Sequence, residues 1–207
     1  MLSNQPNVFL KMVDNIIRKS GPFVAKFEQK PSVPNEEDLQ TIRRAQSLAY
    51  QCAVEVARAL QPGWTEKQTS DLMDQYLKDC GITLFFHKSF AWFGDRTNFS
   101  GFKSYFDFLP TDRVLREGDV FILDTAPILN GNIADIGYTG ALDENSDLRK
   151  MKEFLLSIRQ EIPSLFSSSL STREIWTNVD RKIVEAGYEN VHRKYPFSVL
   201  GHRINKV

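Results

Sequence analysis

Two aspartates stand in a part of the chain that otherwise favours apolar β-strands, the stretch GDVFILDTAPILNGNIADIGYTG at residues 118–140. The dipeptide Asn130-Gly131 separates its two apolar runs and favours a two-residue type I′ hairpin turn, because both turn positions need positive φ. A turn of that length fixes which residues face each other across the hairpin. The predicted pairs are Leu129 with Asn132, Ala126 with Asp135, and Asp124 with Gly137. Asp124 and Asp135 are therefore expected to be diagonal neighbours on one face, with side chains about 7 Å apart or closer.

Two carboxylates this close on a largely buried surface repel each other and lose hydration. One of them must bind a proton, or both must share a cation. Oxygen ligands on a rigid hairpin suit Mn, Co, Fe, Zn or Mg, and Gly137 leaves room for an ion beside Asp124. The alternative is that one aspartate lies at the rim of the sheet and caps a loop. The hairpin alone leaves both interpretations open.

The elements that must position this hairpin begin with a predicted helix pair. Asn35 is a favourable N-cap, and the acidic residues that follow it complement the helix dipole. Apolar residues recur at helical spacing as far as Pro62-Gly63, which ends the run. Thr65 and Gln68 form a capping box for a second helix that ends near Gly81. The following residues, 82–108, are dense in aromatic and β-branched side chains, which favours strands and long loops.

A second helix pair is predicted after the hairpin. Apolar residues at helical spacing indicate a helix over residues 148–162, closed by Pro163. Ser171 and Glu174 form a capping box for a further helix that ends at Gly187. Both capping boxes begin sixteen residues before a closing glycine, which indicates an internal duplication. Each copy should consist of two helices followed by antiparallel strands, and the second copy is expected to be cut short.

Composition favours one globular domain in a chain of 207 residues, of which 42% are apolar. We expect residues 1–34 to form an N-terminal extension and linker, and residues 35–207 to form the domain. Lysine plus arginine equals aspartate plus glutamate at 26 each, so no net charge attracts nucleic acid or an anionic membrane. No stretch has the length and apolar character of a membrane span. The two cysteines, Cys52 and Cys80, lack paired spacing and favour reduced thiols in the cytoplasm.

Three segments together resemble the creatinase and methionine aminopeptidase superfamily, the M24-type metallopeptidases that include Xaa-Pro aminopeptidases. They are LQPGWTEKQTSDLMDQYLKDCGI from residue 60, LREGDVFILDTAPILNGNIADIGYT with its aspartates eleven residues apart, and LGHRI at residues 200–204. The resemblance covers most of the chain from about residue 36. It implies an α+β pita-bread fold, in which two pseudo-twofold halves curve antiparallel strands around a metal centre. The second half would be incomplete in this chain.

The resemblance also implies a set of metal ligands. By motif position, Asp124 binds one metal, Asp135 bridges two metals, and His202 binds one. A complete site holds two divalent ions, Mn, Co, Fe or Zn, and this chain is expected to hold one or none. The reason is that the family supplies two further glutamates from strands after the histidine, and Val207 comes before either could occur. Arg203 also stands where the family usually has glycine, close to the metals.

The function implied by the resemblance is a metal-dependent exopeptidase of the aminopeptidase or Xaa-Pro peptidase type. It would hydrolyse the N-terminal peptide bond of a peptide through a metal-activated water. The alternative is a catalytically inactive, peptidase-like binding module that lacks the glutamate ligands. A creatinase-like amidinohydrolase ranks last, because that branch normally has a separate N-terminal domain. The early end of the second copy has three explanations, which are a fragment of a longer enzyme, a degraded gene, and a partner chain that completes the sheet, as in a homo-oligomer.

His87 is a candidate substrate-binding residue. The segment FFHKSFAWFGDRTNFSG is similar to a creatinase-like branch with a His…Phe-Gly…Thr pattern, and this similarity implies that His87 contacts substrate. The residues alone favour a structural histidine, buried or at the rim of the site. The catalytic acid or base is left unassigned.

Overall fold

The computed structural model describes residues 33–190, so that residues 1–32 and 191–207 lie outside the described part of the chain. The first helix, α2 (Glu36–Ala59), begins at Asn35, whose side chain accepts a hydrogen bond from the Asp38 amide at 2.8 Å. The second, α3 (Glu66–Asp79), begins with the predicted capping box of Thr65 and Gln68. Both predicted helix starts are therefore confirmed.

The strands form two three-stranded antiparallel sheets, β1-β4-β5 and β2-β3-β6. Their bounds are β1 (Leu84–Phe85), β2 (Phe90–Phe93), β3 (Val120–Thr125), β4 (Pro127–Leu129), β5 (Asn132–Ile133) and β6 (Ile136–Ala141). Two short 3-10 helices, η2 (Gly94–Asn98) and η3 (Tyr105–Phe108), lie between β2 and β3 in the sequence. Residues 82–108, expected to form strands and loops, contain β1 and β2 and two 3-10 helices in the loops.

The predicted hairpin register is found. Asn130 and Gly131 have φ values of 48° and 77°, as a type I′ turn requires. Leu129 pairs with Asn132, and Asp124 pairs with Gly137. The hairpin does not run as two continuous strands, however. The ladder is interrupted at Ala126 on one strand and at Ala134 and Asp135 on the other, because the Ala126 carbonyl accepts a hydrogen bond from Phe86 beside β1.

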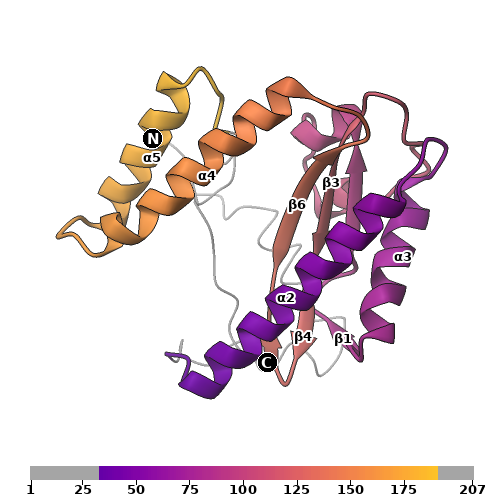
Figure 1. Cartoon of the computed structure of the whole chain (residues 1–207), viewed down its shortest axis with the longest axis horizontal. Helices are drawn as coiled ribbons and strands as arrows, with labels where there is room; N and C mark the ends of the chain where they lie inside the picture. Colours follow the sequence, from indigo (N-terminus) through magenta and orange to yellow (C-terminus); the bar gives the residue numbers. More distant parts are fainter. Residues whose placement is uncertain (1–32, 191–207) are drawn as a thin grey trace, which may run out of the picture.

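The main core lies between the helix pair and one face of the β2-β3-β6 sheet. In Figure 1, α2 crosses the strands diagonally and α3 lies beside it. Side chains alternate along β3, so that Phe121, Leu123 and Thr125 are buried while Val120, Ile122 and Asp124 are half-buried. Phe121 and Leu123 belong to the core cluster that α2 and α3 complete. Asp124 therefore points to the opposite face, which is how the fold tolerates a carboxylate in an apolar strand.

A second helix pair, α4 (Ser146–Phe166) and α5 (Thr172–Glu185), follows β6. Figure 1 shows this pair to the upper left of the strands, with α3 to their right. The capping box of Ser171 and Glu174 is confirmed. The expectation that Pro163 closes the third predicted helix is wrong, since α4 continues to Phe166. Pro163 removes the hydrogen bond to the residue 159 carbonyl and its ring crowds that carbonyl, but Arg159 is exposed, so that water can satisfy the displaced carbonyl.

None of the helices within residues 33–190 combines the length and apolar character needed to cross a membrane. Both cysteines are free thiols, as expected. Their environments differ. Cys52 is fully buried in the core, and its thiol lies 3.5 Å from the Met73 carbonyl, whereas Cys80 is exposed.

This difference predicts selective thiol chemistry. Burial, helped by the charge of Asp74, raises the pKa of the Cys52 thiol to about 12, and only the thiolate is a good nucleophile. We expect a colorimetric disulfide reagent at neutral pH to modify Cys80 alone in the native protein, and both thiols in denaturant. A Cys80→Ser variant should show almost no native reaction. Rapid native modification of that variant would contradict the burial of Cys52.

Candidate metal centre

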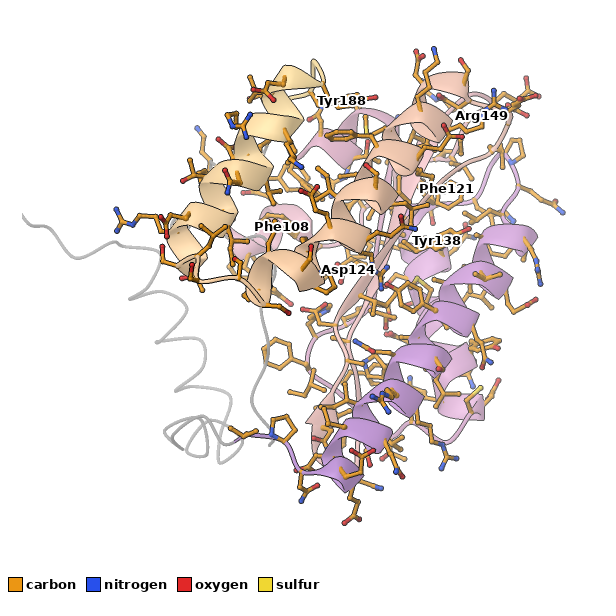
Figure 2. All side chains as sticks on the ribbon, turned by 60° about the vertical axis from the view of Figure 1, so that its left-hand side comes forward. Phe108, Phe121, Asp124, Tyr138, Arg149 and Tyr188 are labelled. Atoms are coloured by element: carbon orange, nitrogen blue, oxygen red, sulfur yellow. The ribbon has the colours of Figure 1, made fainter. Side chains whose placement is uncertain are left out.

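Asp124 lies near the end of β3, between two neighbouring strands. It pairs with Phe90 of β2 on one side and with Gly137 of β6 on the other. Directly paired residues in antiparallel strands point to the same face, so that Phe90 and Asp124 share the face opposite the main core. Gly137 adds no side chain there, and a Cβ built on it would lie 3.9 Å from Asp124 Oδ2. The glycine therefore keeps open the space beside the carboxylate, as expected. Figure 2 labels Asp124, which in the projection of this view is drawn between α4 and α2.

Asp135 lies at the point where the second hairpin strand is interrupted, directly before β6. The Ala134 amide still donates to the Pro127 carbonyl at 3.1 Å, so that the register continues through the interruption. The side chains of Asp124 and Asp135 are 25% and 22% exposed, respectively. The aspartates are therefore neighbours on one face, as predicted, but this face is half-buried and not the core interior.

His87 joins the two aspartates from the connection between β1 and β2. Its Nε2 atom lies 3.5 Å from Asp124 Oδ1 and 3.6 Å from Asp135 Oδ1. Its ring stacks on Phe90, with centroids 4.8 Å apart and planes within 5° of parallel. Since Phe90 shares the face of Asp124, this stacking places the imidazole over the same face. The sequence did not predict that His87 and the two aspartates converge on one point.

The three side chains fit a divalent ion. Within residues 33–190, His87, Asp124 and Asp135 form the one group of metal-binding side chains found, and one ligand atom of each lies within 4.8 Å of the others. First-row ions lie about 2.0–2.2 Å from nitrogen and oxygen ligands, so tetrahedral ligands of one ion are about 3.4 Å apart. The two distances from His87 are close to that value. The donor set of one imidazole and two carboxylates suits the metals named from the sequence.

The electrostatics of His87 reflect this convergence. Burial acts to lower its pKa, but the hydrogen bond with Asp135 and the charge of Asp124 outweigh burial, so that the pKa is raised above its ordinary value. The carboxylates thus stabilise positive charge at this point, whether it is carried by a proton on the ring or by a bound cation.

The other ligand implied by the resemblance is not placed by the structure. His202 lies outside the described residues, as does Arg203 beside it. The division between an extension at residues 1–34 and a domain at 35–207 also stays a prediction. The part of the candidate site that the structure describes is formed by Asp124, Asp135 and His87.

The chain is similar in sequence to known proteins. Metallopeptidase family M24 matches residues 40–206 of the chain. A methionine aminopeptidase from Archaeoglobus fulgidus is 22% identical over 157 residues, which are 76% of this chain and 51% of that protein. The chain thus spans about half the length of this relative.

Solved structures show the same fold. An X-Pro aminopeptidase from Thermotoga maritima aligns with a TM-score of 0.67 and 17% identity, over 86% of this chain and 51% of its own. A prolidase from Pyrococcus furiosus aligns with a TM-score of 0.64 and 17% identity, over 91% of this chain and 54% of its own. These similarities confirm the pita-bread fold, with its second half only partly represented. The match over residues 40–206, in a chain with this fold and with paired aspartates on its hairpin, shows that the protein belongs to metallopeptidase family M24.

Proposed function

We propose that this chain carries part of the active site of a metal-dependent exopeptidase, of the aminopeptidase or Xaa-Pro peptidase type. The observation that carries the proposal is the pair of aspartates. They lie on one open, half-buried face of the hairpin, with Gly137 leaving space beside Asp124. Family membership supports a metal-dependent peptidase at the level of the family. The peptide substrate and the metals Mn, Co, Fe or Zn are part of the proposal.

In this proposal Asp124 and Asp135 hold the metal, with His202 as a further ligand. When bound, divalent ions lower the pKa of water and polarise a carbonyl group. The chain itself contributes the position of the ligands. Asp124 is fixed by strands on both sides, and Asp135 by its connection to β6. Ligands held by strands are more precisely placed than ligands on loops.

The neighbouring aromatic side chains are proposed to form the wall against which the N-terminal residue of a peptide would lie. Phe90 stacks on His87, and the Phe90 and Tyr105 rings meet edge to face with centroids 6.1 Å apart. Tyr105 and Phe106 remain 38% and 56% exposed. Such partly exposed rings beside polar groups are typical of small-molecule sites. The reduced state of both cysteines supports the cytoplasm as the proposed location.

Metal content tests the proposal. After equilibration with Mn²⁺ or Co²⁺ and desalting, we expect the chain to retain about one ion, since three protein ligands form a typical catalytic site. Asp135→Ala should retain almost none. Asp112→Ala is the matched control, because Asp112 is 81% exposed, pairs with Lys67 and is not part of the described cluster of His87, Asp124 and Asp135. Release of the N-terminal residue from short peptides, with and without proline in second place, is measured in parallel.

The outcomes separate the two candidate functions. Metal retention with peptide hydrolysis supports the peptidase, and both should be lost in Asp135→Ala. Metal retention without hydrolysis of any peptide favours the peptidase-like binding module. An absence of metal from wild type and variant alike would exclude this chain as a metal-dependent enzyme.

A further inference from the structure

We propose that His87 is itself a metal ligand in this chain, binding through Nε2 to the ion held by Asp124 and Asp135. The proposal rests on the proposed function, since it assumes that the aspartates bind metal. It goes beyond the substrate contact expected from the sequence, and it adds an imidazole nitrogen from His87 to the two carboxylates and to the proposed ligand His202. The convergence of three ligand atoms within 4.8 Å of one another is the observation that carries it.

Backbone hydrogen bonds before and after His87 in the chain hold this residue beside Asp124 and Asp135. Before it, Phe85 pairs with Pro127, and the Phe86 amide donates to the Ala126 carbonyl at 2.9 Å. After it, Phe90 pairs with Asp124. The connection between β1 and β2 therefore runs alongside the very residues at which the hairpin ladder is interrupted. At the interruption the Ala126 carbonyl bonds to this connection, and His87 lies beside both aspartates.

The ring nitrogens have assigned roles. His87 Nδ1 lies 2.8 Å from the Lys88 carbonyl oxygen, and a carbonyl can only accept, so Nδ1 must carry the proton. In the neutral ring Nε2 is then the atom with a free lone pair, and it faces both carboxylates at 3.5 and 3.6 Å. Metal-binding histidines typically donate their second ring N–H to a carbonyl or carboxylate, which fixes the tautomer and the orientation of the ring.

The surrounding contacts hold the connection rigidly. The Ser89 amide donates to Asp74 at 3.1 Å, and the Ser89 hydroxyl lies 2.8 Å from the Thr125 hydroxyl. The Ser70 hydroxyl donates to the Ser89 carbonyl. Ser89, two residues after His87, is thus hydrogen-bonded both to α3 and to β3. With the ring stacked on Phe90, Nε2 is held in place before any ion binds, which lowers the entropic cost of binding.

An imidazole ligand makes a specific prediction about metal preference. Nitrogen ligands suit Zn²⁺, Co²⁺ and Ni²⁺, whereas sites made of oxygen alone suit Mn²⁺ and Mg²⁺. Loss of the imidazole should therefore weaken Co²⁺ binding far more than Mn²⁺ binding. A substrate-contacting histidine would change neither, and a protonated histidine that merely neutralises the aspartates would compete with both ions.

The test measures Co²⁺ and Mn²⁺ affinity of the full chain by calorimetric titration at mildly alkaline pH. We expect His87→Ala to bind Co²⁺ at least about 100-fold more weakly, because even outer partners of metal ligands contribute about 10–100-fold. The visible spectrum of bound Co²⁺ should also change, since one nitrogen ligand is lost. Mn²⁺ affinity should fall by a clearly smaller factor.

Two further variants serve as controls. Lys88→Ala removes a neighbouring cation that pairs with Asp71 at 2.6 Å, but it keeps the carbonyl that orients the ring, and it should bind Co²⁺ like wild type. His87→Gln keeps a polar side chain of similar size and should resemble His87→Ala. Circular dichroism establishes that each variant is folded.

Equal or tighter Co²⁺ binding by His87→Ala would overturn the proposal while leaving the aspartate site intact. If the wild-type chain binds neither ion, the proposed function fails as well, and the two failures are therefore distinguishable. An equal loss of Mn²⁺ and Co²⁺ affinity would also overturn it, because the effect would then not come from a nitrogen ligand.

Discussion

Replacing Glu66 with alanine is expected to lower the free energy of unfolding by about 3–5 kcal/mol, the cost of removing one partner of a buried ion pair. Domains of this size are stabilised by only about 5–15 kcal/mol in total. This single change should therefore bring the protein close to unfolding at moderate temperature. It is the largest stability effect that we expect from one side chain.

The reason is that Glu66, fully buried at the first turn of α3, joins segments far apart in the sequence. Its carboxylate accepts hydrogen bonds from the Phe93 amide at 3.0 Å and from Arg96 Nε at 2.9 and 3.0 Å. It also accepts from the Thr111 amide and hydroxyl, at 2.9 and 2.7 Å. Removal leaves these buried donors unsatisfied and leaves the Arg96 guanidinium without its counter-ion.

Urea unfolding followed by circular dichroism measures the effect. Arg96→Ala should cost less than Glu66→Ala, because Glu66 keeps its bonds to Phe93 and Thr111. The matched control is Asp112→Ala, which removes an exposed pair with Lys67 on the same helix and should cost less than about 1 kcal/mol. A Glu66→Ala variant as stable as that control would refute the role assigned to the buried carboxylate.

The second large effect is expected from metal itself. Co²⁺ at a free concentration one hundred times its dissociation constant should stabilise the folded chain by about 2.7 kcal/mol, because it binds the native site and not the unfolded chain. In Asp124→Asn the same Co²⁺ concentration should give almost no stabilisation, since the amide lacks the charge that holds the ion.

Thermal unfolding is measured with and without Co²⁺ for each variant. The stabilisation by Co²⁺ is the difference between the two, so that any change in the stability of the metal-free variant does not affect it. Asp143→Asn is a matched control, because its carboxylate accepts from the Gly118 amide and is no part of the described cluster. If Asp124→Asn gained as much stability from Co²⁺ as wild type, the ion would bind elsewhere. Excess Mg²⁺ should not reproduce the full effect, because Mg²⁺ prefers oxygen ligands and retains its waters.

Family membership was predicted correctly from short motifs, and the paired aspartates are the part of the candidate site that local rules could anticipate. The type I′ turn at Asn130-Gly131 sets the register within a few residues. Once the register is set, the alternation of side chains puts Asp124 and Asp135 on one face whatever the rest of the fold does. The helix starts at Asn35, Thr65 and Ser171 are also local, since each cap bonds to an amide three residues away.

The position of His87 could not be predicted in this way. It depends on Phe90 pairing with Asp124 and on the Phe86 amide reaching the Ala126 carbonyl, and these partners are more than thirty residues apart in the sequence. The same pairing interrupts the hairpin, which the sequence predicted as continuous. The face of Asp124 was likewise decided by α2 and α3, whose packing against Phe121 and Leu123 left the aspartate on the half-buried side.

The sequence by itself therefore determined the turn, the caps and the pairing of the two aspartates, because those features rest on bonds between near neighbours in the chain. Only the tertiary structure decided the histidine ligand proposed here and the burial of Glu66 among its distant donors. Contacts of that kind depend on which strand pairs with which and on which sheet face the helices cover. Strand pairing and the choice of covered face follow from the whole fold, so that no short sequence pattern predicts them.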